Sequence, residues 1–149
     1  MEKKVLHLSV SKQWFDLISS GEKKEEYREI KDYWTIRLFD VSPFYTGVGP
    51  RLIILDGKRM TFKELVSSAT SSTAIRVTNL NGEPLNKGVS INELLDSIRI
   101  YTHVLFINGY GDDKPRVEKE IESITIGKPR KGWCPDEFLD KNYFVIKFK

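Results

Sequence analysis

The chain has 149 residues with 30% charged and 40% hydrophobic side chains, and its formal net charge is +3. This length and balance fit one compact domain with a buried core and exclude a disordered chain, while the mild positive charge permits a nucleic-acid partner. No apolar run approaches the ~20 residues of a membrane helix, and the single cysteine, Cys134, indicates a reducing compartment, so we expect a cytoplasmic protein without a membrane partner.

The chain begins with a predicted strand and a predicted amphipathic helix. Residues 5–10 alternate polar and apolar side chains at period two, as a strand does, and this leaves no apolar segment for a signal peptide. A helix is predicted over residues 12–20, with Ser11 as its N-cap. Its apolar side chains are spaced to face the core, and they are Trp14, Leu17 and Ile18 with Phe15 beside them.

The end of this helix leads into a charged strand. Gly21 supplies the left-handed residue that closes the helix. A strand is predicted over about residues 24–29, and strand alternation places Glu26 and Arg28 on one face. Lys23 is out of phase with Glu26 in an ideal strand, so it joins the same face only by approaching from the turn before the strand.

The middle of the chain predicts short elements separated by loops. A short helix over 32–39 with Asp32 as its cap precedes residues 40–100, which have the character of an insertion into a smaller core. Within this insertion the pattern predicts a loop at 42–50 and a strand at 51–55 that ends in a turn at Asp56-Gly57. Two capping boxes predict helices at about 62–68 and 91–98. Between these helices the pattern predicts a polar loop at 67–73 and a hairpin near 75–82.

The C-terminal third contains further strands. Residues 103–108 predict a strand that ends at a glycine-flanked tyrosine, residues 116–126 form a long alternating run, and residues 143–148 predict a final strand. Several strands with few, short helices predict an α+β domain dominated by a curved or closed sheet.

The segment Gly21-x-Lys23-x-x-Glu26-x-Arg28 resembles the signature of the ASCH domain, a branch of the PUA-like superfamily associated with RNA. Later segments are similar to the same family at the places expected for them, namely Asn108-Gly109-Tyr110, Gly132-Trp133 and Tyr143-Phe144. The resemblance covers about residues 5–40 and 103–148. It implies one domain over 1–149 with a variable insertion at about 40–100, folded as a PUA-like β-barrel with a few short peripheral helices and a cleft lined by residues 21–28.

The residues of this cleft predict a binding site for an anionic or polar ligand. Arg28 offers a planar fork of donors and Lys23 a mobile point charge, and both suit a phosphate or a carbonyl oxygen. Glu26 is expected to accept a hydrogen bond from a base amino group or to hold a water molecule. Tyr110 and Trp133 are predicted walls on which a base stacks, and cationic side chains flank Trp133.

Each of these residues also has a structural interpretation. Glu26 and Arg28 also fit an exposed pair on a strand, worth at most ~1 kcal/mol, and Trp133 also fits a core or barrel-plugging aromatic. The charged side chains around the motif are expected to form a solvated face, and they are Glu22, Lys24, Glu25 and Glu29. The run Lys128-Pro129-Arg130-Lys131 is expected to be a solvated loop.

Three functions follow from this pattern. The first is a small RNA- or nucleotide-binding domain whose ligand occupies the cationic cleft. The second is a hydrolase, either a ribonuclease or an amidohydrolase acting on a modified nucleoside, with Lys23 and Glu26 as catalytic residues; some ASCH relatives use a lysine and a threonine here, and Glu26 stands at the threonine position. The third is a protein-interaction module whose partner contacts the insertion.

We expect no metal and no cofactor. With His7, His103 and one cysteine, the chain predicts no zinc site, whereas Mg²⁺ or Mn²⁺ on carboxylates stays open. Cys134 has no histidine near it in the sequence and is expected to be inert packing rather than a nucleophile.

Overall fold

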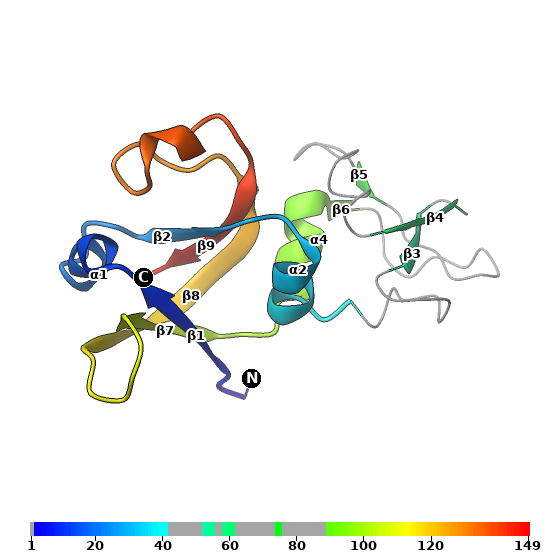
Figure 1. The fold of residues 1–149 in the computed structure, drawn as a ribbon. Helices are drawn as coiled ribbons and strands as arrows, with labels where there is room; N and C mark the ends of the chain where they lie inside the picture. The colour runs from blue at the N-terminus through cyan, green and yellow to red at the C-terminus, as the bar shows by residue number, and fades with distance from the viewer. Residues whose placement is uncertain (1, 42–51, 56–57, 62–73, 76–88) are drawn as a thin grey trace. The chain divides into compact units, whose positions relative to one another are not determined.

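The computed structural model describes residues 2–41, 52–55, 58–61, 74–75 and 89–149. The chain divides into two compact units, one formed by residues 1–29 with 100–149 and the other by residues 30–99. The expected arrangement of a single domain with an insertion at about 40–100 stays a prediction. The first unit carries the large sheet (Figure 1) and contains residues 21–28.

The first unit is built on a five-stranded mixed sheet. Its strands are β1 (Val5–Val10), β2 (Glu25–Arg28), β7 (His103–Asn108), β8 (Arg116–Gly127) and β9 (Tyr143–Phe148). The order is β1-β7-β8-β9-β2, with β1 parallel to β7 and the other pairs antiparallel. The predicted α+β class and strand positions are confirmed. Across the described residues the outer strands β1 and β2 do not pair, so the sheet is open.

The long strand β8 gives the sheet its curvature. Residues 116–120 pair with β7, and residues from Ile121 onward pair with β9. The register shifts between Ile121 and Ser123, where the strand changes partner. Such an irregularity bends a strand and increases its twist, and Figure 1 shows β8 curving between its two neighbours.

Two apolar clusters pack on the sheet. The main one consists of buried side chains from alternate positions of the strands and from the helix beside them, namely Leu6, Leu8, Val10, Phe15, Ile18, Val104, Phe106, Ile121, Ile124, Phe144, Ile146 and Phe148. The second contains Tyr27, Tyr143, Val145 and Cys134 on the other face of β9, with Trp133, Phe138 and Leu139 packed against it. The segment that follows β8 therefore covers the face of β2 and β9 opposite the main core.

The helix α1 (Lys12–Ser19) lies between β1 and β2, as predicted. Ser11 occupies its N-cap position, although its side chain makes no capping hydrogen bond. Phe15 and Ile18 are buried, whereas Trp14 and Leu17 are only half-buried, so the prediction that Trp14 and Leu17 face the core is wrong in that detail. Trp14 instead lines a pocket beside this helix.

The second unit contains two short helices and two antiparallel pairs of short strands in its described part. The short helix predicted over 32–39 is present as α2 (Asp32–Leu38), but the prediction of Asp32 as its cap is wrong, because Lys31 occupies the N-cap position and Asp32 is the first helical residue. α4 (Ile91–Ser97) confirms the second capping box, since Ser90 Oγ accepts a hydrogen bond from the Glu93 amide at 3.2 Å.

The predicted strand at 51–55 is confirmed as β3 (Leu52–Leu55), which pairs with β4 (Lys58–Thr61). β5 (Ala74–Ile75) pairs with β6 (Val89–Ser90). The predictions for the loop at 42–50, the turn at Asp56-Gly57, the helix at 62–68, the loop at 67–73 and most of the hairpin near 75–82 lie outside the described residues. In the described part of the chain, no helix has the length and apolar character needed to cross a membrane.

Gly21 closes α1 as predicted, with φ at +86° and open space where a side chain would sit. We expect Gly21→Ala to lower the free energy of unfolding by about 1–2 kcal/mol, because alanine resists the left-handed conformation. Urea denaturation measures this. Gly127→Ala is the control: it places a methyl 3.6 Å from Val145 Cγ2, an ordinary contact, and should leave stability unchanged or slightly higher. Equal losses in both variants would contradict the account.

Candidate functional site

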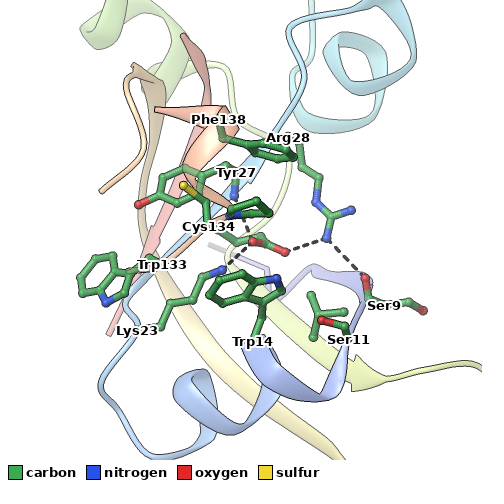
Figure 2. A pocket seen from close by; sticks show the side chains of 12 residues that line it. Ser9, Ser11, Trp14, Lys23, Tyr27, Arg28, Trp133, Cys134 and Phe138 are labelled. Atoms are coloured by element: carbon green, nitrogen blue, oxygen red, sulfur yellow. Dashed lines mark hydrogen bonds and ion pairs between the residues drawn. The ribbon is translucent and has the colours of Figure 1, made fainter. Parts of the chain in front are cut away.

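A pocket of about 250 Å³ lies where the end of β1, the start of α1 and the edge of β2 meet the segment after β8. Figure 2 shows its lining from close by. Charged, hydroxyl and aromatic side chains gather here, and the lining residues are Ser9, Val10, Ser11, Trp14, Lys23, Glu26, Tyr27, Arg28, Trp133, Cys134, Pro135 and Phe138. Of the predicted site residues, Lys23, Glu26, Arg28 and Trp133 are thus brought together.

Lys23 enters the pocket from the turn after α1. Its backbone amide donates to the Leu17 carbonyl at 2.9 Å, which holds the turn against the helix end. Its side chain is nearly inaccessible, at 1% exposure, and Nζ donates to Glu26 Oε1 at 3.0 Å. Nζ also lies 4.8 Å from the centre of the Trp14 ring and 5.7 Å from that of Tyr27. Such contacts with ring faces stabilise a buried cation.

Glu26 is the centre of the charged cluster. Glu26 is 7% exposed. Besides its bond from Lys23, Oε1 accepts a hydrogen bond from the Tyr27 amide at 3.1 Å, and Oε2 accepts one from an Arg28 terminal nitrogen at 2.8 Å. The same nitrogen of Arg28 lies 3.4 Å from the Ser9 carbonyl on β1. Arg28 therefore connects the two outer strands of the open sheet, which share no backbone ladder among the described residues.

In the ion cluster of Lys23, Glu26 and Arg28, the first two residues are buried and Arg28 is partly buried. The alternative of a solvated surface pair is therefore wrong, because residues of α1 and of the segment after β8 cover this part of β2. Removing such ions from water costs several kcal/mol per ion unless each is paired. The carboxylate between the two cations provides that pairing.

The opposite face of β2 holds the covering segment in place. The Tyr27 hydroxyl donates to Glu25 Oε1 at 2.8 Å and accepts from the Arg130 amide at 3.0 Å. Arg130 Nε lies 3.5 Å from Glu25 Oε2. Burial, and secondarily the neighbouring carboxylate, raises the pKa of the Tyr27 phenol despite the amide that donates to it. The prediction that Glu25 belongs to a solvated face is wrong, because strand alternation turns it toward this segment.

Trp133 and Cys134 bring the covering segment to the pocket. Trp133 is half-buried, and the guanidinium carbon of Arg130 lies 5.3 Å from its ring centre. Cys134 is buried, its Sγ lies 3.8 Å from the Arg130 carbonyl, and burial raises the pKa of its thiol. A raised pKa keeps a thiol protonated at neutral pH and makes it a poor nucleophile.

Tyr110 does not line this pocket, which corrects its predicted role as a wall. The residue is 86% exposed, and its neighbours Gly109 and Gly111 adopt left-handed backbone conformations with φ values of +92° and +112°. Sequence reasoning also missed Trp14, which was assigned to the core. A place for Trp14 in the site was indicated by its position, because it stands four residues after the end of a predicted strand and shortly before the turn that carries Lys23.

No group of three or more His, Cys, Asp or Glu side chains in the described ranges is arranged to hold a metal ion. No family model matches the chain, and searches of curated proteins and of solved structures return no match. The similarity to the ASCH domain therefore stays a prediction carried by the residues themselves.

The Tyr27 hydroxyl is expected to anchor the covering segment. Tyr27→Phe leaves the Arg130 amide and the Glu25 carboxylate without this partner, so the free energy of unfolding should fall by about 1–3 kcal/mol and the Arg130 amide should exchange its hydrogen faster. Denaturation and hydrogen exchange measure the two effects. Tyr110→Phe, which removes an exposed hydroxyl, should change neither; an unchanged exchange rate in Tyr27→Phe would contradict the anchoring role.

The raised pKa of Tyr27 also predicts a pH dependence. The folded protein holds the phenol proton more tightly than the unfolded chain, so the stabilisation is complete below the ordinary value of 10.0 and is lost as the pH rises above it. Unfolding measured between pH 9 and 11 should show this decline, and Tyr27→Phe should make it shallower. An equal slope in the variant would contradict the assignment to Tyr27.

Proposed function

We propose that the chain is an RNA- or nucleotide-binding domain of the ASCH type, with a PUA-like barrel fold, and that its ligand occupies the pocket of Lys23, Glu26 and Arg28. The observation that carries the proposal is the buried ion cluster inside a pocket with aromatic walls. The curvature of β8 and the Arg28 bridge between the outer strands support the barrel-like part of the proposal.

The energetics of the ion cluster favour a binding role. Well-packed apolar side chains of similar volume often stabilise a protein as well as a buried ion cluster does. A cluster that also borders a cavity is therefore better explained by recognition than by stability. Two cations around one carboxylate leave a net positive charge beside the cavity, which favours a ligand that carries phosphate or carbonyl oxygen atoms.

The aromatic lining and the nearby cations fit the same class of ligand. Trp14, Trp133 and Phe138 give the pocket apolar ring surfaces, and stacking on such rings is worth about 1–3 kcal/mol per base. In the chain just before Trp133, Lys128 and Lys131 are exposed and the Arg130 side chain is 64% exposed. Exposed cations next to a stacking pocket attract a phosphate backbone in a salt-dependent way.

A hydrolase acting on a modified nucleoside is the second candidate. Its support is the 3.0 Å contact between Lys23 Nζ and Glu26 Oε1 in a pocket, since paired acid and base groups within hydrogen-bond distance are what hydrolysis of an amide requires. In this candidate Lys23 activates a water molecule that Glu26 orients. Analysis of the ligand after incubation separates the two candidates.

The test is the binding of a short labelled single-stranded RNA of mixed sequence, followed by fluorescence anisotropy over a series of salt concentrations. We expect Lys23→Met and Arg28→Met each to weaken binding about tenfold or more, because each removes a charge-assisted contact worth about 1.5–3 kcal/mol. Lys24→Met is the matched control, since Lys24 is the exposed neighbour of Lys23 and its loss changes the net charge equally.

The outcomes of this experiment are distinct. Binding that Lys24→Met retains and the two pocket variants lose, with RNA of unchanged mass, would support the binding domain. A change of RNA mass that depends on Lys23 would support a ribonuclease, and Lys23-dependent release of the acyl group from an acylated nucleoside incubated in the same way would support the amidohydrolase. Equal weakening in all three variants would assign the effect to net charge alone, and the proposed pocket would then be wrong. Circular dichroism establishes that each variant is folded before binding is compared.

A further inference from the structure

We infer that Arg130 binds a phosphate group of the ligand whose base occupies the pocket. This inference rests on the proposed function, because it names the residue that holds the phosphate beside the same site. The observation behind it is that the Arg130 side chain is exposed and yet is held by a carboxylate and by an aromatic ring. The sequence predicted only a solvated loop at this position.

The ions inside the pocket are engaged with one another. Lys23 is 1% exposed and donates to Glu26. The Arg28 nitrogen that donates to Glu26 also lies 3.4 Å from the Ser9 carbonyl. These cations give the cavity its net charge, whereas a phosphate outside the cavity needs further donors that solvent can reach. Such donors have to come from residues beside the pocket.

The Arg130 side chain lies against a residue of the pocket wall. Trp133 lines the pocket, and the guanidinium carbon of Arg130 lies 5.3 Å from the centre of its ring. A tight turn brings the two side chains together, because the Arg130 carbonyl accepts from the Trp133 amide at 3.1 Å and Gly132 between them has a φ of +90°. A nucleotide whose base contacts Trp133 in the pocket therefore brings its phosphate to the side of Arg130.

Three contacts orient Arg130 before any ligand binds. Its backbone amide donates to the Tyr27 hydroxyl at 3.0 Å, which fixes the position of the main chain. Its Nε lies 3.5 Å from Glu25 Oε2, and the other oxygen of that carboxylate accepts from the Tyr27 hydroxyl. The Trp133 ring supports the guanidinium. An arginine that is already oriented loses less side-chain entropy when it binds an anion.

The terminal nitrogens of Arg130 are the part that serves a ligand. Its closest approach to Glu25 is through Nε, and across the described residues neither terminal nitrogen donates a hydrogen bond. The side chain is 64% exposed, so an anion reaches these nitrogens from solvent. The planar fork of arginine matches two oxygens of a phosphate, a geometry that the point charge of a lysine does not supply.

The exposed neighbours of Arg130 favour an anion as well. Glu25 offsets one positive charge, while Lys128 and Lys131 are exposed close to Arg130 in the chain and leave a positive excess around it. These two lysines have no orienting contacts of the kind that hold Arg130. We therefore expect them to attract phosphates in general and Arg130 to bind one phosphate in a fixed geometry.

The test measures binding of the same labelled single-stranded RNA over a series of salt concentrations. Arg130→Lys keeps the charge and removes the fork, so it should weaken binding about tenfold with little change in the salt dependence. Arg130→Met also removes the charge, so it should in addition lower the slope of log affinity against log salt by about one. Lys131→Met is the matched control, because it removes the same charge from an exposed neighbour, and it should weaken binding less than Arg130→Lys does.

Two preparations of the RNA identify the phosphate that Arg130 binds. One carries a 5′-phosphate and the other has only the phosphodiesters of its backbone. An effect of Arg130→Lys on both preparations would assign the contact to a phosphodiester. An effect confined to the first would assign it to a terminal phosphate. Both results support the inference, and they name the form of the ligand.

The results also separate this inference from the proposed function. Wild-type affinity in Arg130→Lys, or equal losses in Arg130→Met and Lys131→Met, would overturn the role of Arg130. Faster hydrogen exchange of the residue-130 amide in Arg130→Lys would overturn it too, because the loss would then come from the turn that Tyr27 holds. In these cases the pocket stands if Lys23→Met and Arg28→Met still weaken binding. If the wild-type chain binds no RNA, the proposed function fails and the inference fails with it.

Discussion

The carboxylate of Glu26 is the group on which both the fold of this region and the proposed site depend. It binds Lys23 from the turn after α1 and Arg28 from its own strand, and Arg28 reaches the Ser9 carbonyl on β1. Three segments thus meet at one buried anion. Without it, two buried cations would lose their partner, which is costly in a site withdrawn from water.

The local part of this arrangement was predictable from the sequence. Strand alternation placed Glu26 and Arg28 on one face, and the phase of Lys23 required it to enter from the turn, as the structure has it. The glycine that ends α1 was equally predictable, because its left-handed backbone is a property of the helix end. Each of these features is determined by residues close together in the chain, so the pattern of residue types is enough to predict it.

The burial of the site was not predictable, because it depends on residues far apart in the chain. The Tyr27 hydroxyl and the Arg130 amide are separated by 103 positions, and their contact fixes the segment that covers β2. This contact turns Glu25 from an expected surface residue into a buried one. The pattern around Tyr110 likewise showed a glycine-flanked loop, but not that Tyr110 would be exposed and would not line the pocket.

The central claim is that this pocket binds the ligand, and the indole signals of the three tryptophans test it most directly. In a ¹⁵N-labelled sample titrated with single-stranded RNA, the account predicts that the Trp14 and Trp133 side-chain resonances shift, because both line the pocket. The Trp34 resonance is the internal comparison, because Trp34 belongs to α2 in the second unit and is not one of the residues that line the pocket. A shift of Trp34 alone, or binding of the RNA without any change at Trp14 and Trp133, would contradict the account.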